Sequence, residues 1–302
     1  SPNLVPFMKK HKKEISSDIV LICDTGLFES RVPSIVTRLR GLLKEEIIIT
    51  GPDKDLHSGM YGGIAVNPAR ILTCILSKLH DEDGAVTIPD FYDGVPELPQ
   101  NILDQWLGLN FKHDQFLADV GLSTPAGEKD RSALEMLWSR PTCEINGIKA
   151  GYIGEGFKTV LPAQASAKIS FRLVANQDPL KIRKKFRNMV KDLLPDDCQV
   201  FFKEHEASKA SQMDISSPEF EKAREAISEE WGIEAAFIGC GGSIPIAGYF
   251  QKITGVDPML IGFAKDDDQI HSPNEKYDLE SFRKGIRSWV RVINSFSELQ
   301  NV

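Results

Sequence analysis

Three short polar segments of the chain contain residue types that metallohydrolases use. Asp24 directly follows an apolar run, His57 lies in the segment Asp55 to Gly59, and His271 opens the segment His271 to Glu275. Carboxylate oxygen and imidazole nitrogen are ligands that zinc accepts. A zinc hydrolase needs about three protein ligands per metal and a general base. Asp24 and His271 are the two convincing ligands, so the sequence predicts part of a metal site.

Each of these residues also has a structural interpretation, which the residue types alone leave open. Asp24 could close a strand through an Asx turn. His271 could be a surface histidine in an acidic loop. His57 could stabilise a developing oxyanion, or it could be a turn histidine that bonds local backbone.

Four further residues could bind a substrate carboxylate. The planar guanidinium of Arg172 suits a carboxylate, although an outward strand position that meets solvent explains the residue equally well. The Thr159 hydroxyl could contact the same ligand as Arg172. Gly242 and Ser243 precede an apolar, helix-like run at 244–250, where backbone N–H groups could hold an anion. A glycine turn with a serine cap is the alternative.

Composition excludes several classes of function. The chain has 302 residues and a net charge of −7, which disfavours nucleic acid as a partner because nucleic-acid binding depends on clustered Lys and Arg. No apolar run approaches the roughly 20 residues that cross a bilayer. Its 5 cysteines are widely spaced and contain no C-x-x-C pair. This usage predicts a cytoplasmic protein with reduced thiols.

The two ends of the chain predict one α/β catalytic domain, made of residues 1–39 and 209–302. Apolar runs at 18–23 and 258–263 read as buried strands, and a terminal amphipathic helix begins near Leu279. Asp24 and His271 both follow such strands. Because ligands bind outside the carboxyl ends of strands in open α/β sheets, the two residues are expected at one crevice.

The middle of the chain has the order strand, helix, strand, strand, helix, strand. This order is typical of a ferredoxin-like unit, and it predicts a separate domain over residues 40–208. Its helices begin at Asn67-Pro68 and Asp178-Pro179, where a capping side chain precedes a proline at the first helical position. An insertion at about 81–142 is too long for a plain loop, so a structured excursion is expected there.

Taken together, these segments resemble the carnosinase and cytosolic non-specific dipeptidase branch of the di-zinc metallopeptidases, whose relatives include aminoacylases and glutamate carboxypeptidases. The resemblance covers essentially the whole chain. The order of its pieces is specific, whereas no single piece is. The segments that carry it include LICDTG, DLHSGMYGG, GYIGEGFKTVLP, FRLV, GGSIPI and HSPNEK.

The resemblance implies a role for each candidate residue. Asp24 and His271 would each be a ligand of one of two Zn²⁺ ions, with Mn²⁺ as an alternative metal. His57 would stabilise the transition state from a dimer partner. The residues implied to bind the substrate's C-terminal carboxylate are Thr159, Arg172, Gly242 and Ser243. The 40–208 domain would be the lid and dimerisation domain of a homodimer.

Members of this family also contain a zinc-binding H-x-D-x-x-P segment and a Glu-Glu pair, both of which precede the position that matches Ser1. The resemblance therefore implies a truncated catalytic domain with impaired activity and metal binding. The predicted function is metal-dependent hydrolysis of dipeptides or short peptides with a free C-terminal carboxylate. The alternatives are an inactive dimerisation scaffold and a hydrolase of N-acyl amino acids.

Overall fold

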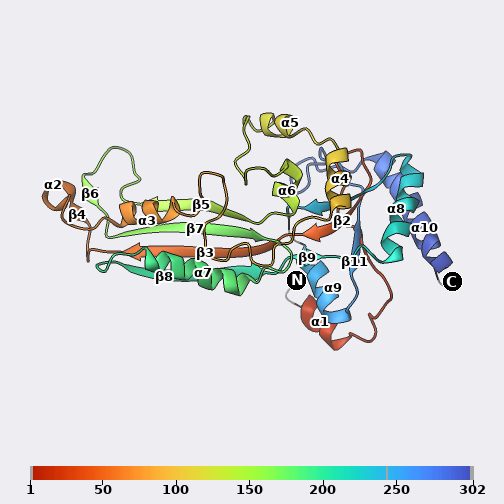
Figure 1. Cartoon of the computed structure of the whole chain (residues 1–302), viewed down its shortest axis with the longest axis horizontal. Helices are drawn as coiled ribbons and strands as arrows, with labels where there is room; N and C mark the ends of the chain where they lie inside the picture. Colours follow the sequence, from red (N-terminus) through yellow and green to blue (C-terminus); the bar gives the residue numbers. More distant parts are fainter. Residues whose placement is uncertain (1–2, 243, 300–302) are drawn as a thin grey trace. The chain divides into compact units, whose positions relative to one another are not determined.

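The computed structural model describes residues 3–242 and 244–299. Its packing divides the chain into two compact units (Figure 1). Unit 1 takes in the chain up to Leu39, the segment Glu97–Phe111 and the chain from Ser211 onward. Unit 2 takes in Arg40–Pro96 and Lys112–Ala210. The predicted insertion at 81–142 is therefore shared, because its middle segment packs within unit 1.

The sheet of unit 1 is built from short, almost completely buried strands. Its order is β1-β11-β2-β10, with β9 beside β2. β1 lies parallel to β11 and β2 parallel to β10, while β11 and β2 are antiparallel. The bounds are β1 Val20–Ile22, β2 Ser34–Leu39, β9 Ser211–Gln212, β10 Ala236–Cys240 and β11 Pro258–Ile261.

Helices pack around this sheet. The inserted helix α4 contacts β10, where Trp106 Nε1 donates to the carbonyl of Phe237 at 2.8 Å and the Phe237 N–H donates to Gln105 Oε1 at 2.9 Å. These bonds satisfy backbone groups at an edge strand, which explains why this part of the insertion packs here. The helices of unit 1 are α1 Leu4–Lys10, α4 Gln100–Gly108, α8 Pro218–Trp231, α9 Pro245–Thr254 and α10 Leu279–Leu299.

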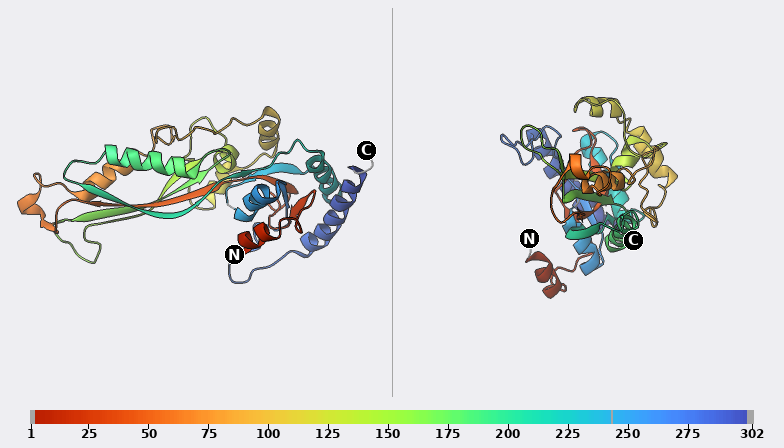
Figure 2. Two further views of the ribbon diagram at one scale, coloured as in Figure 1. Left: turned by 90° about the horizontal axis from the view of Figure 1, so that it is seen from below. Right: turned by 90° about the vertical axis from the view of Figure 1, so that its left-hand side faces the viewer.

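The terminal helix α10 lies beside α8 (Figure 2). It turns small residues toward the protein, and Ser281 and Ser288 are fully buried. Trp231 Nε1 of α8 donates to Ser288 Oγ at 3.0 Å. Val292 is also fully buried, whereas five other apolar side chains face outward with 52% to 69% of their area exposed; they are Leu279, Phe282, Ile286, Val290 and Ile293. The predicted helix is therefore present, and its apolar row is uncovered.

Unit 2 contains a four-stranded antiparallel sheet in the order β5-β7-β3-β8. With its two helices the chain order is strand, helix, strand, strand, helix, strand, which confirms the predicted ferredoxin-like fold. A second, two-stranded sheet pairs β4 with β6. The strands are β3 Gly41–Thr50, β4 Leu56–His57, β5 Thr142–Ala150, β6 Val160–Leu161, β7 Gln164–Leu173 and β8 Gln199–Ser208.

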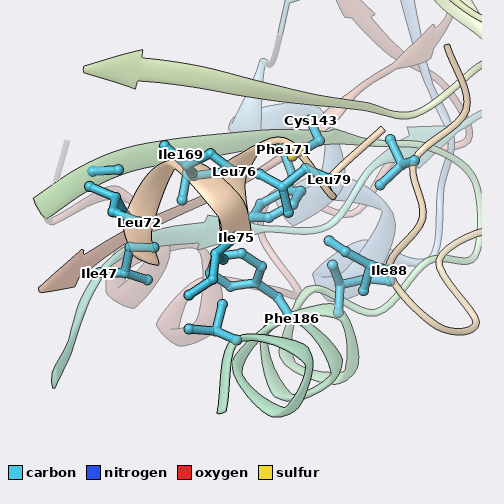
Figure 3. Packing of buried hydrophobic residues seen from close by; sticks show 14 of the residues in the cluster. Ile47, Leu72, Ile75, Leu76, Leu79, Ile88, Cys143, Ile169, Phe171 and Phe186 are labelled. Carbon is cyan, nitrogen blue, oxygen red and sulfur yellow. The ribbon is translucent and has the colours of Figure 1, made fainter. Parts of the chain in front are cut away.

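Two helices cover one face of the larger sheet and form the core of unit 2. Both are capped as predicted: Asn67 Oδ1 accepts from the Ala69 N–H, and Asp178 Oδ1 accepts from the Leu180 N–H. Figure 3 shows Leu72 and Phe186 packed with side chains of the sheet. The helices of unit 2 are α2 Ser58–Tyr61, α3 Pro68–Leu76, α5 His113–Ala118, α6 Ala133–Trp138 and α7 Pro179–Asp192.

Across the residues that the structure describes, no helix combines the length and the apolar character that a membrane crossing requires.

Candidate active site

Two loops of unit 1 leave neighbouring parallel strands at the same edge of the sheet. β1 and β11 pair with Ile22 opposite Leu260. Asp24 lies two residues beyond the end of β1 and is exposed, and the loop that carries His271 follows β11. The Leu27 N–H donates to the carbonyl of Ala264 at 2.9 Å, which joins the two loops. Asp24 and the His271 loop therefore meet at one edge.

An open pocket of about 1000 Å³ lies between these loops. The carboxylates of Asp24 and Glu275 line it, and so does Ile270, the residue before His271. His271 itself is exposed. The other lining residues include Cys23, Thr25, Phe263, Lys265, Asp266, Gln269, Lys276 and Tyr277.

The loop 265–276 is organised around one buried carboxylate. Asp268 is only 1% exposed; its Oδ2 accepts from the Lys265 N–H at 2.8 Å, and its Oδ1 accepts from Lys276 Nζ at 3.0 Å. Burial alone would raise the pKa of Asp268, but these two bonds outweigh it and lower the pKa below its ordinary value. Gln269 and His271 have positive φ angles of 55° and 64°. Such conformations are costly for residues other than glycine, and they cluster at functional sites.

The two predicted metal ligands, Asp24 in this pocket and His271 beside it, match zinc in type but not in number. Asp24 offers carboxylate oxygen and His271 imidazole nitrogen, which are ordinary zinc ligands. Within residues 3–242 and 244–299, however, no three His, Cys, Asp or Glu side chains are grouped so that they could hold a metal. The described residues alone therefore do not fit a complete zinc site.

The predicted anion-binding turn lies between β10 and α9. Gly242 is exposed, and its N–H donates to Cys240 Sγ at 3.3 Å. Ser243 lies outside the described residues. α9 begins at Pro245, with Ile244 at its N-cap and no capping side-chain bond. The backbone N–H of Gly242 thus has a local acceptor in this structure.

In unit 2, His57 ends β4 of the small sheet, and Thr159 directly precedes β6 of the same sheet. His57 pairs with Val160, and the Ser58 N–H donates to the carbonyl of Thr159 at 3.0 Å. His57 Nδ1 accepts from the Gly59 N–H at 3.0 Å. Both His57 and Thr159 are exposed. The histidine therefore bonds local backbone, as the structural interpretation predicted, and it also leaves its outer ring edge accessible.

Within one copy of the chain, Thr159 and Arg172 are separated by most of the length of β7. Thr159 lies beyond the end of β7 that begins at Gln164 (Figure 1). Arg172 lies eight residues after Gln164 on that strand. At about 3.3 Å per residue, Gln164 and Arg172 are about 26 Å apart. Arg172 is half-buried, and it pairs with Leu42 and Thr142 on the neighbouring strands.

Sequence reasoning did not single out Asp268 or Lys276. The acidic run Lys265 to Asp268 reads as an ordinary polar loop, and its composition does not show which carboxylate is buried. The proximity of Lys276, eight residues after Asp268, was the available signal, because an oppositely charged partner permits burial of a carboxylate.

Comparison with known proteins places the chain among peptidases. A family model described as a peptidase dimerisation domain matches residues 37–198, more than half of the 302 residues. The Cys-Gly metallodipeptidase of Schizosaccharomyces pombe is 29% identical, over 94% of this chain and 60% of that protein. Human Beta-Ala-His dipeptidase is 26% identical, over 98% of this chain and 59% of that protein.

Solved structures agree. The structure of the dipeptidase Dug1p from Saccharomyces cerevisiae matches with a TM-score of 0.78 and 28% identity, over 98% of this chain and 63% of that one. The chain thus spans about three fifths of the length of these relatives. The family resemblance predicted from the sequence is confirmed, and the chain belongs to the M20 family of peptidases.

Proposed function

We propose that this protein hydrolyses the peptide bond of dipeptides or short peptides that have a free C-terminal carboxylate, and that the reaction depends on a metal. The observation that carries the proposal is the meeting of Asp24 with the His271 loop at one pocket, on neighbouring parallel strands. Named relatives of the chain are metallodipeptidases.

The metal that we propose is zinc, as two ions, with Mn²⁺ as the alternative. Asp24 would hold one ion and His271 the other, and the described residues do not supply the remaining ligands. Zinc bound in a hydrolase supplies an activated water. Removal of metal with a chelator should therefore abolish turnover of dipeptides, and its return should restore turnover. Turnover that continues at full rate without metal would refute this part of the proposal.

The residues of unit 2 would bind and orient the substrate. Arg172 would pair with the free carboxylate through two parallel N–H bonds, and the Thr159 hydroxyl would donate a further bond. His57 would donate from its accessible ring edge to the oxygen on which negative charge develops. In unit 1, Gly242 and Ser243 are proposed as binders of a substrate carboxylate.

The separation along β7 supports a homodimer in which two copies build each site. His57 and Thr159 share one small sheet, so they would act together, whereas Arg172 lies at the far end of β7. We therefore propose that a site containing Arg172 of one copy receives His57 and Thr159 from the other copy. The dimer would form through unit 2, which contains most of the segment matched by the dimerisation model.

Mixed dimers test this arrangement. His57→Ala and Arg172→Ala proteins, each inactive alone, should regain about a quarter of the activity when subunits exchange at random, because one site in each mixed dimer is intact. A mixture of His57→Ala with Thr159→Ala is the control and should regain nothing, since both residues come from the same copy. No recovery in the first mixture would overturn the two-copy site.

Two alternatives are separated by simple measurements. An inactive dimerisation scaffold would bind less than stoichiometric zinc and show no turnover. A hydrolase of N-acyl amino acids would have a higher kcat/KM for those compounds than for dipeptides.

A cytoplasmic location is also proposed, because all five cysteines are free thiols.

A further inference from the structure

The segments 51–59 and 159–163 are tied together at several points near His57. The Gly51 N–H donates to the carbonyl of Ala163 at 3.0 Å, and the Ser58 N–H donates to the carbonyl of Thr159 at 3.0 Å. Between these bonds, the β4 and β6 strands pair at Leu56 and His57. The two segments therefore form one short ladder that carries both His57 and Thr159.

The Asp55 side chain adds a bond across this ladder. Asp55 lies two residues before His57, and its Oδ1 accepts from the Ala163 N–H at 2.8 Å. Ala163 is thus held through both its N–H and its carbonyl. Asp55 is exposed, and exposed hydrogen bonds contribute little net stability. The geometry that this bond fixes matters more than its contribution to the stability of the fold.

The orientation of the His57 ring follows from its neighbour. Nδ1 accepts a bond from the Gly59 N–H at 3.0 Å. An accepting nitrogen of a neutral imidazole has no proton, so the proton is on Nε2. A Cβ at position 59 would lie 3.0 Å from His57 Cε1 and 3.2 Å from Nδ1. Glycine at this position therefore leaves room for the ring to lie against the turn.

We propose that Asp55 is a positioning residue: through Ala163 it holds the ladder that keeps His57 bonded to Gly59, so that neutral His57 presents an Nε2–H donor outward. The role of that donor toward an oxyanion rests on the proposed function. The positioning itself does not, because it concerns only bonds within unit 2. His57 then acts as a hydrogen-bond donor and not as the base that removes a proton from water.

Nuclear magnetic resonance of the whole chain with ¹⁵N-labelled histidine tests the positioning without any activity. The wild-type protein should show His57 with its proton on Nε2 and a Gly59 amide that exchanges slowly. Asp55→Ala should speed exchange of the Gly59 amide several-fold and shift the His57 ring signals, with the unfolding midpoint almost unchanged. Asp55→Asn retains an oxygen acceptor and should restore the wild-type spectrum.

Asp53→Ala is the matched control, because Asp53 is an exposed acid in the same turn; its spectrum should equal that of the wild type. A proton on Nδ1 of His57 in the wild type would overturn the proposal. So would an Asp55→Ala protein whose Gly59 exchange and His57 signals match those of Asp53→Ala.

A kinetic measurement separates this inference from the proposed function. In an active dimer, Asp55→Ala should lower kcat several-fold with little change in KM, and Asp55→Asn should recover most of the loss. His57→Gln, whose amide reaches toward the Nε2 position, should retain more activity than His57→Asn. Absence of dipeptidase activity would refute the proposed function, and the spectra would still decide whether Asp55 positions His57.

Discussion

The two candidate histidines lie in loops that are built in different ways. The His57 loop of unit 2 is held by a backbone ladder between two segments, with Asp55 as an exposed support. The His271 loop of unit 1 is held by the buried carboxylate of Asp268, and residues 269 and 271 adopt left-handed backbone conformations. One loop therefore depends on regular pairing, and the other on a buried charge and strained backbone.

The difference indicates where each loop tolerates change. A ladder distributes its bonds over several backbone groups, so removal of one side chain leaves the rest in place. A buried carboxylate concentrates the bonds in one residue, and its loss leaves donors without an acceptor. Substitutions in the His271 loop should therefore cost more stability than matched substitutions in the His57 loop.

The largest difference in the free energy of unfolding is expected between substitutions of two glycines, one in each unit. A Cβ at Gly262, directly after β11, would lie 1.8 Å from the carbonyl oxygen of Thr25. Backbone cannot move aside as a side chain can, so Gly262→Ala should destabilise unit 1 by about 3 kcal/mol. Gly59→Ala, where the added atom meets only the His57 ring, should cost about 0.5 kcal/mol. Urea unfolding measures both, and equal losses would contradict the comparison.

Removal of the two supporting carboxylates should give the next contrast. Asp268→Ala leaves the Lys265 N–H without its side-chain acceptor, whereas Lys276 Nζ keeps Asp267 Oδ1 at 2.9 Å; the change should cost about 2 kcal/mol. Asp55→Ala removes one exposed bond and should cost at most about 1 kcal/mol. Thermal unfolding of the two variants checks the order. Asp268→Asn keeps one oxygen acceptor, so its unfolding temperature should lie between those of the wild type and Asp268→Ala.

Acid should act on the Asp268 loop in a defined direction. Because the folded-state pKa of Asp268 is below its ordinary value, the carboxylate stabilises the folded state above the unfolded-state value of about 3.9. This contribution is lost as pH falls from that value through the folded-state pKa. Below about pH 4, stability should thus fall more steeply in wild type than in Asp268→Asn. Parallel curves of unfolding midpoint against pH would exclude this role.

Substitution by glycine should change stability in opposite directions in the two loops. Gln269 has a φ of 55°, so Gln269→Gly should relieve strain and stabilise unit 1 by about 0.5 kcal/mol. Lys54 has no such constraint, and Lys54→Gly should destabilise unit 2 by about 0.5 kcal/mol because only chain entropy changes. Denaturation midpoints measured side by side test the sign. A loss of stability in both variants would mean that residue 269 is not strained.

Periodicity and capping residues were sufficient to predict the four-stranded sheet of unit 2 and the two helices that cover it. Ile47 and Ile49 alternate along β3, and Asn67 and Asp178 mark the helix starts. In unit 1, however, the strands β2 and β10 were not predicted. The edge strand β10 has only five residues, and its Gly239 gives a weak strand signal. The helix α10 was predicted, but not the face it buries, since that face consists of Ser281, Ser288 and Gly285 together with Val292 and not of the predicted apolar row.

Strand order explains which part of the candidate site was predictable. Asp24 and the His271 loop were expected at one crevice because both follow strands, and the parallel pairing of β1 with β11 brings them together. Thr159 was expected to share a ligand with Arg172 because it lies in the glycine-rich turn before the strand that carries Arg172, and within one copy the length of β7 separates the two residues. The importance of Asp268 depends on burial, which the sequence of a polar loop does not reveal.

The outward row of leucine, phenylalanine, isoleucine and valine on α10 has a practical consequence. A helix with one apolar face and one polar face is surface-active, since adsorption at a boundary between water and an apolar phase lowers its free energy. We expect dilute solutions of this chain to lose protein to air bubbles and plastic walls, and a mild detergent to prevent the loss. Ile286→Lys should reduce adsorption, which recovery after shaking would measure, whereas an exposed polar change such as Asn294→Lys should not.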